Sequence, residues 1–208
     1  MRTLPAALAL ACLIGASAAR AQPGTPAEIA ARYENASSAT FRYRVAIAAL
    51  LQLKPGMVAA EIGTTSGFVA RALAAQVGPT GRVIAATADP KMAAYMTDRA
   101  RGEGIANLSA LVARPGATGL EAEPVDAIAI VNAFSAFPNQ PAMLQALASS
   151  LKPGGALLIV DLPREGQGAS QIGIDADDLV KLATAAGFKR EAESSVVPGQ
   201  YAIRFRKP

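Results

Sequence analysis

The stretch E-I-G-T-T-S-G-F, residues 61–68, has the residue types of a ligand-binding loop. It follows a short apolar run and places an acid, Glu61, ahead of two glycines, Gly63 and Gly67. Glycine serves such loops because it adopts positive φ and lets a ligand approach the backbone closely. Thr65 stands between the glycines, where a β-branched residue at positive φ would cost about 1–2 kcal/mol. The pattern therefore predicts an ordinary backbone at Thr65, a ligand that sits further out, or a tight turn with no ligand.

The composition argues against several kinds of catalysis. The chain contains no histidine, and its single cysteine is Cys12. The commonest general base, the commonest metal ligand and the readiest nucleophile are therefore scarce, so we expect no hydrolase triad and no metal site. The loop at 61–68 also lacks the G-x-G-x-x-G spacing of dinucleotide folds and the G-K-[ST] ending of a phosphate-binding loop. Ser66 is not part of a G-x-S-x-G motif.

Residues 1–21 have the pattern of a secretory signal peptide. Arg2 precedes an uncharged, mostly apolar run of 17 residues, and A-R-A at 19–21 is a small-x-small cleavage pattern. The run is shorter than the roughly 20 apolar residues of a membrane-spanning helix. A lipid anchor on Cys12 is disfavoured because no large aliphatic residue stands three positions upstream. We expect cleavage before Gln22, export to the periplasm or the medium, and no stable membrane insertion afterwards.

The charge pattern argues against nucleic acid as a partner. The formal net charge is +4, and loss of Arg2 and Arg20 with the signal peptide would lower it to about +2. The remaining basic residues are scattered, apart from Arg204, Arg206 and Lys207 near the end of the chain. No basic patch of the kind that binds phosphate backbones is visible. We therefore expect no nucleic-acid partner.

Apolar runs and helical patterns alternate along the chain and must position the loop. Five runs have the length and continuous hydrophobicity of buried parallel strands, and helical spacing fills most intervals between them. The runs are 57–62, 82–87, 108–113, 126–132 and 156–161, and the helices are 68–77, one beginning at Asp89-Pro90, 141–150 and 176–186. A strand at 188–196, a V-P-G-Q turn and the alternating Y-A-I-R-F-R predict a closing β-hairpin.

Residues 22–53 are predicted to form an N-terminal helical segment ahead of a domain at 54–208. One helix begins at Pro26 with Thr25 as its cap. A second helical stretch covers roughly 39–53 and ends at K-P-G.

From 53 to 205 the chain resembles the class I S-adenosylmethionine-dependent methyltransferases. The resemblance is carried by an ordered set of short motifs. They are L-K-P-G-M at 53–57, E-I-G at 61–63, V-G-P-T-G-R-V at 77–83, V-D at 125–126, L-K-P-G-G at 151–155 and A-G-F at 186–188. The resemblance implies a doubly wound α/β fold of Rossmann-like type. Its seven-stranded, mostly parallel sheet would have the order 3-2-1-4-5-7-6, with strand 7 antiparallel.

The resemblance further implies S-adenosylmethionine as cofactor, bound at the carboxyl ends of the strands where the strand order reverses. The residues that it assigns to cofactor binding are Glu61, Gly63, Thr65, Gly67, Thr87 and Asp89. Thr87 stands where the family commonly has an acid for the ribose hydroxyls, and Asp89 lies two residues later, where it also fits the cap of a helix. Ala113 and Arg114 stand where an acid often lies near the adenine.

Three polar residues at strand ends are the candidates for the acceptor side, namely Asn132, Ser135 and Asp161. Phe134 and Phe137 either line a pocket there or pack in the core. Methyl transfer suits a chain without histidine, because a displacement at a sulfonium methyl relies largely on holding nucleophile and methyl in line.

Two hypotheses remain open from the sequence, and the family resemblance makes the first the leading one. The first is a methyltransferase acting on an unidentified small-molecule acceptor, with an altered cofactor loop. The second is a non-catalytic exported protein of the same fold that binds another ligand or a partner protein. Export favours the second hypothesis, because charged S-adenosylmethionine is made inside the cell and does not cross a membrane unaided.

Overall fold

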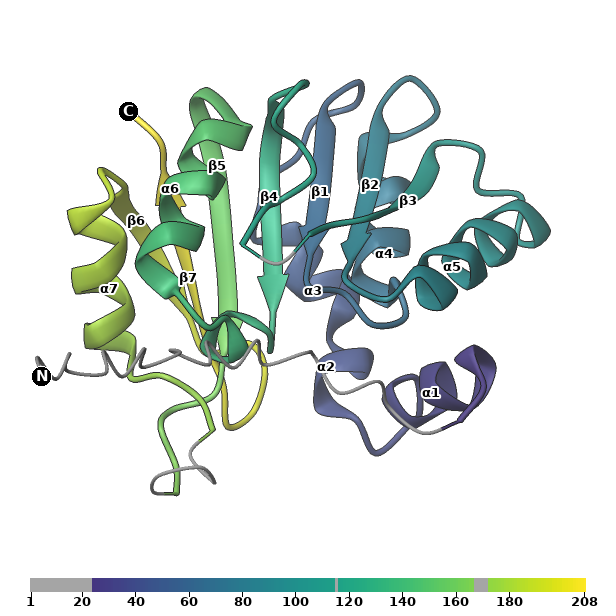
Figure 1. Ribbon diagram of the computed structural model, residues 1–208, viewed down its shortest axis with the longest axis horizontal. Helices are drawn as coiled ribbons and strands as arrows, with labels where there is room; N and C mark the ends of the chain where they lie inside the picture. The colour runs from purple at the N-terminus through teal and green to yellow at the C-terminus, as the bar shows by residue number, and fades with distance from the viewer. Residues whose placement is uncertain (1–23, 115, 167–171) are drawn as a thin grey trace, which may run out of the picture.

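The computed structural model describes residues 24–114, 116–166 and 172–208, and its centre is one seven-stranded sheet (Figure 1). The strands follow the order β3-β2-β1-β4-β5-β7-β6. They are Val58–Ile62 (β1), Arg82–Thr87 (β2), Leu108–Val112 (β3), Val125–Val131 (β4), Leu151–Asp161 (β5), Lys189–Ser194 (β6) and Tyr201–Arg206 (β7). The strands β1 to β5 pair in parallel, and β7 is antiparallel to both β5 and β6. The predicted fold class and strand order are confirmed.

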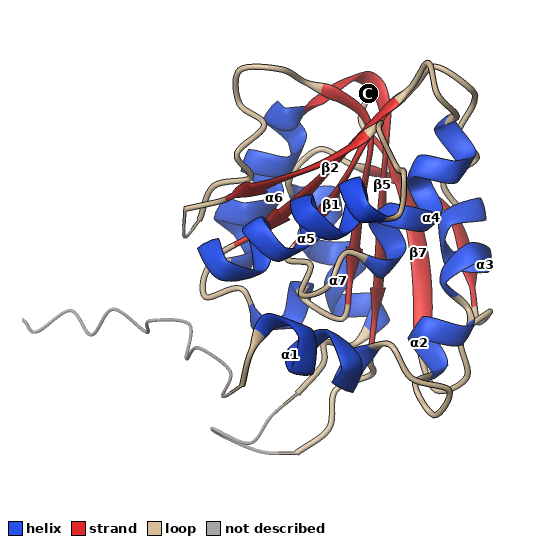
Figure 2. Ribbon diagram, turned by 90° about the vertical axis from the view of Figure 1, so that its right-hand side faces the viewer, coloured by secondary structure: helices blue, strands red, loops and turns tan. Residues whose placement is uncertain are grey.

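Helices cover both sides of the sheet (Figure 2). They are Pro26–Tyr33 (α1), Ala39–Arg42 (α2), Arg44–Ala49 (α3), Phe68–Val77 (α4), Pro90–Gly102 (α5), Gln140–Ser150 (α6) and Ala176–Ala185 (α7), with a 3-10 turn at Phe134–Ala136 (η1). On one face α6 and α7 bury strand residues such as Ile128 and Ile159. On the other, α3, α4 and α5 bury alternate residues such as Ala129 and Leu158. The doubly wound arrangement follows because these strands are apolar on both faces.

The helices α1 and α2 lie beyond the carboxyl ends of the parallel strands (Figure 1). The helix α1 begins with a capping box, in which the Thr25 side chain accepts from the Glu28 amide and the Glu28 carboxylate accepts from the Thr25 amide. This reciprocal pair stabilises the first turn of a helix that is only eight residues long.

The single helical stretch predicted over 39–53 is wrong, because two short helices meet there at Tyr43 (φ −93°, ψ 8°). Thr40 on α2 is held at the end of β4, whereas Ile47 and Ala48 on α3 pack against the face of the sheet beside α4. The chain changes direction between these two contacts. Most other predicted boundaries agree within one or two residues. The exception is β5, which begins at Leu151 because Leu151 already pairs with Val125, ahead of a register shift at K-P-G-G.

Residues 1–21, predicted as a signal peptide, lie outside the described residues. Among the residues that the structure describes, no helix has the length and apolar character needed to cross a membrane. No cluster of potential metal-binding side chains occurs within the same ranges.

Candidate functional site

The loop between β1 and α4 lies at the carboxyl edge of the sheet, beside the point where the strand order reverses between β1 and β4. We call residues 63–67 the glycine loop. The amides of Gly63 and Thr64 both donate to the carbonyl of Ala86 at the end of β2, at 3.0 and 3.2 Å. The loop is therefore anchored to the neighbouring strand and holds a fixed position at this edge.

The backbone of the glycine loop is unstrained at its threonine. Gly63 and Gly67 have φ of 77° and 72°, whereas Thr65 is not among the non-glycine residues with positive φ in the described chain. Of the alternatives open from the sequence, the ordinary backbone at Thr65 is the one observed. Threonine therefore occupies this position without backbone strain.

The fold favours glycine at both positions. A Cβ on Gly63 would lie 2.8 Å from the Cβ of Ala133, which no side-chain rotation can relieve. A Cβ on Gly67 would lie 2.9 Å from the sulfur of Met96, a flexible side chain that can move, so Gly67 is favoured mainly by its positive φ of 72°.

Glu61 lies under the glycine loop and does not face the solvent. It is 4% exposed, and its Oε2 accepts a 2.8 Å hydrogen bond from the amide of Ala70 in the first turn of α4. Burial raises the pKa of Glu61 to about 7, while the Ala70 amide, the Thr64 hydroxyl and the charge of Arg71 act in the opposite direction. Glu61 therefore fixes the start of α4. The cofactor contact that the resemblance implied for Glu61 stays a prediction.

One carboxylate, that of Asp89, lies just beyond the end of β2. The Thr87 hydroxyl accepts from the amide of Asp89 at 3.3 Å, and Asp89 Oδ1 accepts from the amides of Lys91 and Met92 at 2.8 and 3.4 Å. Asp89 is therefore the cap of α5, as its spacing predicted. Its second oxygen, Oδ2, makes no hydrogen bond within the described residues, and the residue is half-buried at the carboxyl edge.

Ser135 and Asp161 form one satisfied pair. Asp161 is buried, its Oδ2 accepts from the Ser135 amide at 2.9 Å, and its Oδ1 accepts from the Ser135 hydroxyl at 3.1 Å and from the Leu162 amide at 2.8 Å. This carboxylate joins η1 to the end of β5. The pair has the geometry of a structural contact.

Asn132 belongs to a different cluster, which sequence reasoning missed. Its side-chain amide donates to the hydroxyl of Thr40 on α2 at 3.1 Å, and the Gln200 amide donates to the same oxygen at 3.0 Å. Asn132 is exposed and has a positive φ of 51°. Nothing in the local pattern around Thr40 or Gln200 indicates this contact, since Thr40 and Gln200 lie 160 residues apart.

The two phenylalanines take different positions. Phe134 is fully buried in the core, and its ring packs edge to face against Phe137, with centroids 6.2 Å apart. Phe137 is half-buried and approaches the backbone at Gly63. Core packing is therefore correct for Phe134, and Phe137 borders the glycine loop.

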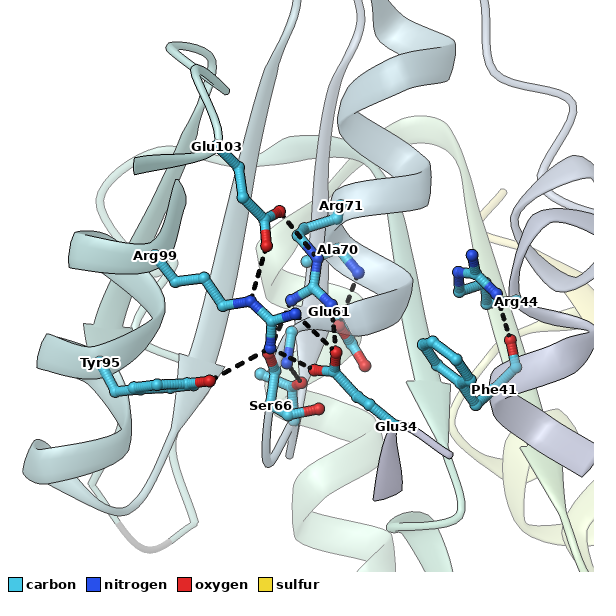
Figure 3. A network of polar contacts seen from close by, with 12 residues as sticks. Glu34, Phe41, Arg44, Glu61, Ser66, Ala70, Arg71, Tyr95, Arg99 and Glu103 are labelled. Atoms are coloured by element: carbon cyan, nitrogen blue, oxygen red, sulfur yellow. Dashed lines mark hydrogen bonds and ion pairs between the residues drawn. The ribbon is translucent and has the colours of Figure 1, made fainter. Parts of the chain in front are cut away.

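A network of ion pairs, also missed from the sequence, joins α1 to the glycine loop (Figure 3). Glu34, the C-cap residue directly after α1, contacts Arg71 of α4 and Arg99 of α5. Glu103 contacts the same two arginines. Arg71 also donates to the carbonyl of Ser66 within the glycine loop.

This topology, with a glycine loop after β1 and β7 antiparallel, is that of the class I S-adenosylmethionine-dependent methyltransferases. The chain belongs to the protein-L-isoaspartate(D-aspartate) O-methyltransferase family, which matches residues 21–188.

Two relatives illustrate the range of the sequence likeness. A protein-L-isoaspartate O-methyltransferase of Ignicoccus hospitalis is 32% identical over 108 residues, which are 52% of this chain and 48% of the relative. A ubiquinone/menaquinone biosynthesis C-methyltransferase of Hydrogenovibrio crunogenus is 28% identical over 116 residues, which are 55% of this chain and 46% of the relative. The chain thus aligns with about half the length of each of these relatives.

Solved structures extend the likeness of the fold to most of the chain. A SAM-dependent methyltransferase from Aquifex aeolicus superposes with a TM-score of 0.75 at 21% identity, covering 89% of this chain and all of the other. The [4+2]-cyclase SpnF superposes with a TM-score of 0.68 at 17% identity, covering 80% of each chain. A fold shared by a methyltransferase and a cyclase does not by itself settle the reaction.

Proposed function

We propose that the chain transfers a methyl group from S-adenosylmethionine to a carboxylate oxygen. The observation that carries the proposal is the place of the glycine loop, with Gly63 and Gly67 at positive φ, at the strand-order switch point of a chain that belongs to a methyltransferase family. The bound cofactor would supply an activated methyl group on a sulfonium.

The residues at this edge fit that cofactor at two points. The N-terminus of α4 presents backbone N–H groups and a partial positive charge, which suit the carboxylate of the methionine moiety. Asp89 Oδ2 is available to accept from a ribose hydroxyl, which compensates in part for the threonine at position 87. Glu61 holds the first turn of α4 from below and so shapes the first of these two points.

The acceptor class follows from the shortage of bases. The chain has no histidine, and Asp161 is fully engaged with Ser135 and Leu162. A carboxylate acceptor is already ionised near neutral pH, so it needs no general base. Its attack on the methyl converts a carboxylate and a sulfonium into a neutral ester and a thioether, which balances charge. The family description and a relative named as an isoaspartate O-methyltransferase support the same class.

Binding should be tested before turnover. Calorimetric titration of the purified protein with S-adenosylmethionine, and separately with S-adenosylhomocysteine, is expected to give micromolar dissociation constants. Transfer of labelled methyl is then measured onto an isoaspartyl peptide and onto a panel of small carboxylic acids, which separates a peptide acceptor from a small-molecule acceptor. Absence of cofactor binding at millimolar concentration would overturn the proposal.

The second candidate is a non-catalytic protein of the same fold. It is favoured by the end of β2, where Thr87 replaces the ribose-binding acid and Asp89 already caps α5. Tight binding of some other ligand or a partner protein, together with no affinity for either cofactor form, would support it.

We also propose that residues 1–21 direct export and are removed. The charged and apolar pattern of these residues supports this, and the family match begins at residue 21. N-terminal sequencing of the protein recovered from bacterial cells is expected to begin at Gln22. Recovery of cytoplasmic protein with Met1 intact would contradict export.

A further inference from the structure

The end of α1 is tied to the glycine loop through one guanidinium (Figure 3). Each nitrogen of Arg71 has a different partner: Nη1 donates to the Ser66 carbonyl at 3.1 Å, Nη2 contacts Glu34 Oε2 at 2.6 Å, and Nε contacts Glu103 Oε2 at 3.4 Å. A planar guanidinium fixes the directions of its donors relative to each other. The carboxylate of Glu34 therefore sets the direction in which Arg71 offers its donor to the loop.

The peptide between Ser66 and Gly67 is held from both sides. Its carbonyl accepts from Arg71, and its N–H donates to the hydroxyl of Thr64 at 3.0 Å. Gly67, with φ of 72°, is also the residue from which α4 begins. The orientation of this peptide thus decides where the first turn of α4 points, and Arg71 supplies one of its two restraints.

Glu34 is unusually well placed to control Arg71. Its side chain is only 7% exposed, and Arg99 holds it from the other side with contacts of 2.9 and 3.0 Å. Arg71 is 15% exposed, so salt screens its attraction to Glu34 less than it would at the surface. Without the charge on Glu34, two neighbouring guanidinium groups would share Glu103 alone, and Arg71 would shift towards it.

We propose that Glu34 is a positioning residue for the glycine loop, acting through Arg71 on the Ser66–Gly67 peptide. Docking of the end of α1 and binding of the cofactor are then coupled, because both depend on the same arginine. The part that concerns the cofactor rests on the proposed function. The part that concerns the loop can be measured in the ligand-free protein.

The chain offers a matched control for this contact. Glu191 on β6 also accepts from two arginines, Arg204 and Arg206, but it lies on the strand farthest from the loop in the β7–β6 hairpin. The variants Glu34→Gln and Glu191→Gln therefore remove the same kind of ion pair at two distant places. Arg71→Lys is a third variant, since a lysine keeps the charge but replaces three fixed donor directions with a single nitrogen.

The experiment measures hydrogen–deuterium exchange of a peptide covering residues 61–70 in the full chain, at a temperature where all variants remain folded. Glu34→Gln and Arg71→Lys are expected to speed exchange in the glycine loop by about tenfold or more, and Glu191→Gln to leave it unchanged. The affinity for S-adenosylhomocysteine is expected to fall by about tenfold in the first two variants only, as for loss of one charge-assisted hydrogen bond.

The outcomes separate the two proposals. Wild-type exchange rates in the glycine loop of Glu34→Gln, or an equal change in Glu191→Gln, would overturn the positioning role. Faster loop exchange with unchanged affinity would overturn the coupling to cofactor binding. If the wild-type chain binds no cofactor, the proposed function fails, while the exchange rates of the ligand-free variants still decide whether Glu34 positions the loop.

Discussion

Replacing Glu61 with glutamine should change how the stability of the protein depends on pH. Burial raises the pKa of Glu61 from 4.5 to about 7 in the folded chain. The folded state therefore binds more protons than the unfolded state between those two values, and the free energy of unfolding falls as the pH rises through that window. Glutamine keeps an acceptor for the Ala70 amide but does not titrate, so it removes this dependence.

The size of the effect follows from the two pKa values. Each unit of difference corresponds to about 1.36 kcal/mol, and the titration of Glu61 alone should lower the free energy of unfolding by about 2.5 kcal/mol between pH 5 and pH 8. The window is clear of other side chains, since the chain has no histidine and its one cysteine lies at position 12.

The assay is urea denaturation of wild type and Glu61→Gln at several pH values from 5 to 8. The difference in unfolding free energy between the two proteins is expected to grow by about 2.5 kcal/mol across the series. Glu121→Gln is the control, because hydrogen bonds from its own backbone and from its neighbours lower the pKa of Glu121 and confine its effect to acidic pH. A Glu61→Gln difference that stays constant within about 0.5 kcal/mol would refute a largely neutral, buried Glu61.

Four further substitutions test other parts of the site by calorimetry and by urea denaturation. Asp89→Ala should weaken S-adenosylhomocysteine binding by about tenfold and remove a helix cap that contributes about 1 kcal/mol; unchanged affinity would exclude Asp89 from the ribose site. Gly63→Ala should destabilise the fold by about 1–3 kcal/mol and abolish binding, because its Cβ would lie 2.8 Å from the Cβ of Ala133; a stable variant that binds would contradict this crowding. Thr65→Gly should cost about 0.5–1 kcal/mol and leave affinity within about twofold, whereas a large gain in affinity would mean that the threonine obstructs the ligand. Asp161→Asn should lower the free energy of unfolding by about 2 kcal/mol and leave cofactor affinity unchanged. Loss of affinity without loss of stability would show that Asp161 takes part in ligand binding.

The sequence predicts the sheet well because burial on both faces leaves a continuous apolar signal. The strand V-D-A-I-A-I-V at 125–131 is apolar almost throughout and lies at the centre of the sheet. Turn and cap residues indicate where helices begin, as at Gly67 before α4 and Asp89-Pro90 at the start of α5. These signals are local, so a single sequence carries them. The break at Tyr43 is not local, because it depends on what α2 and α3 each contact.

The site was predicted less completely for the same reason. The cap at Asp89 lies within three residues of its partners, and the sequence indicates it. Glu34 contacts partners 37 and 65 residues away. The ion-pair partners of Glu34 are set by the packing of α1 against α5. No spacing pattern in the sequence indicates contacts over such distances.

The glycines that first suggest a ligand do not by themselves prove one. Gly63 is required by its contact with Ala133 and Gly67 is favoured by its positive φ, so both would persist in a protein of this fold that had lost its cofactor. The features that packing does not explain are more informative. Asp89 Oδ2 has no hydrogen bond within the described residues, and the half-buried residue lies at the carboxyl edge of the sheet, so this oxygen is free to accept from a ligand hydroxyl. Affinity for the cofactor should therefore depend more on Asp89 than on Thr65, although Thr65 is the more conspicuous departure in the sequence.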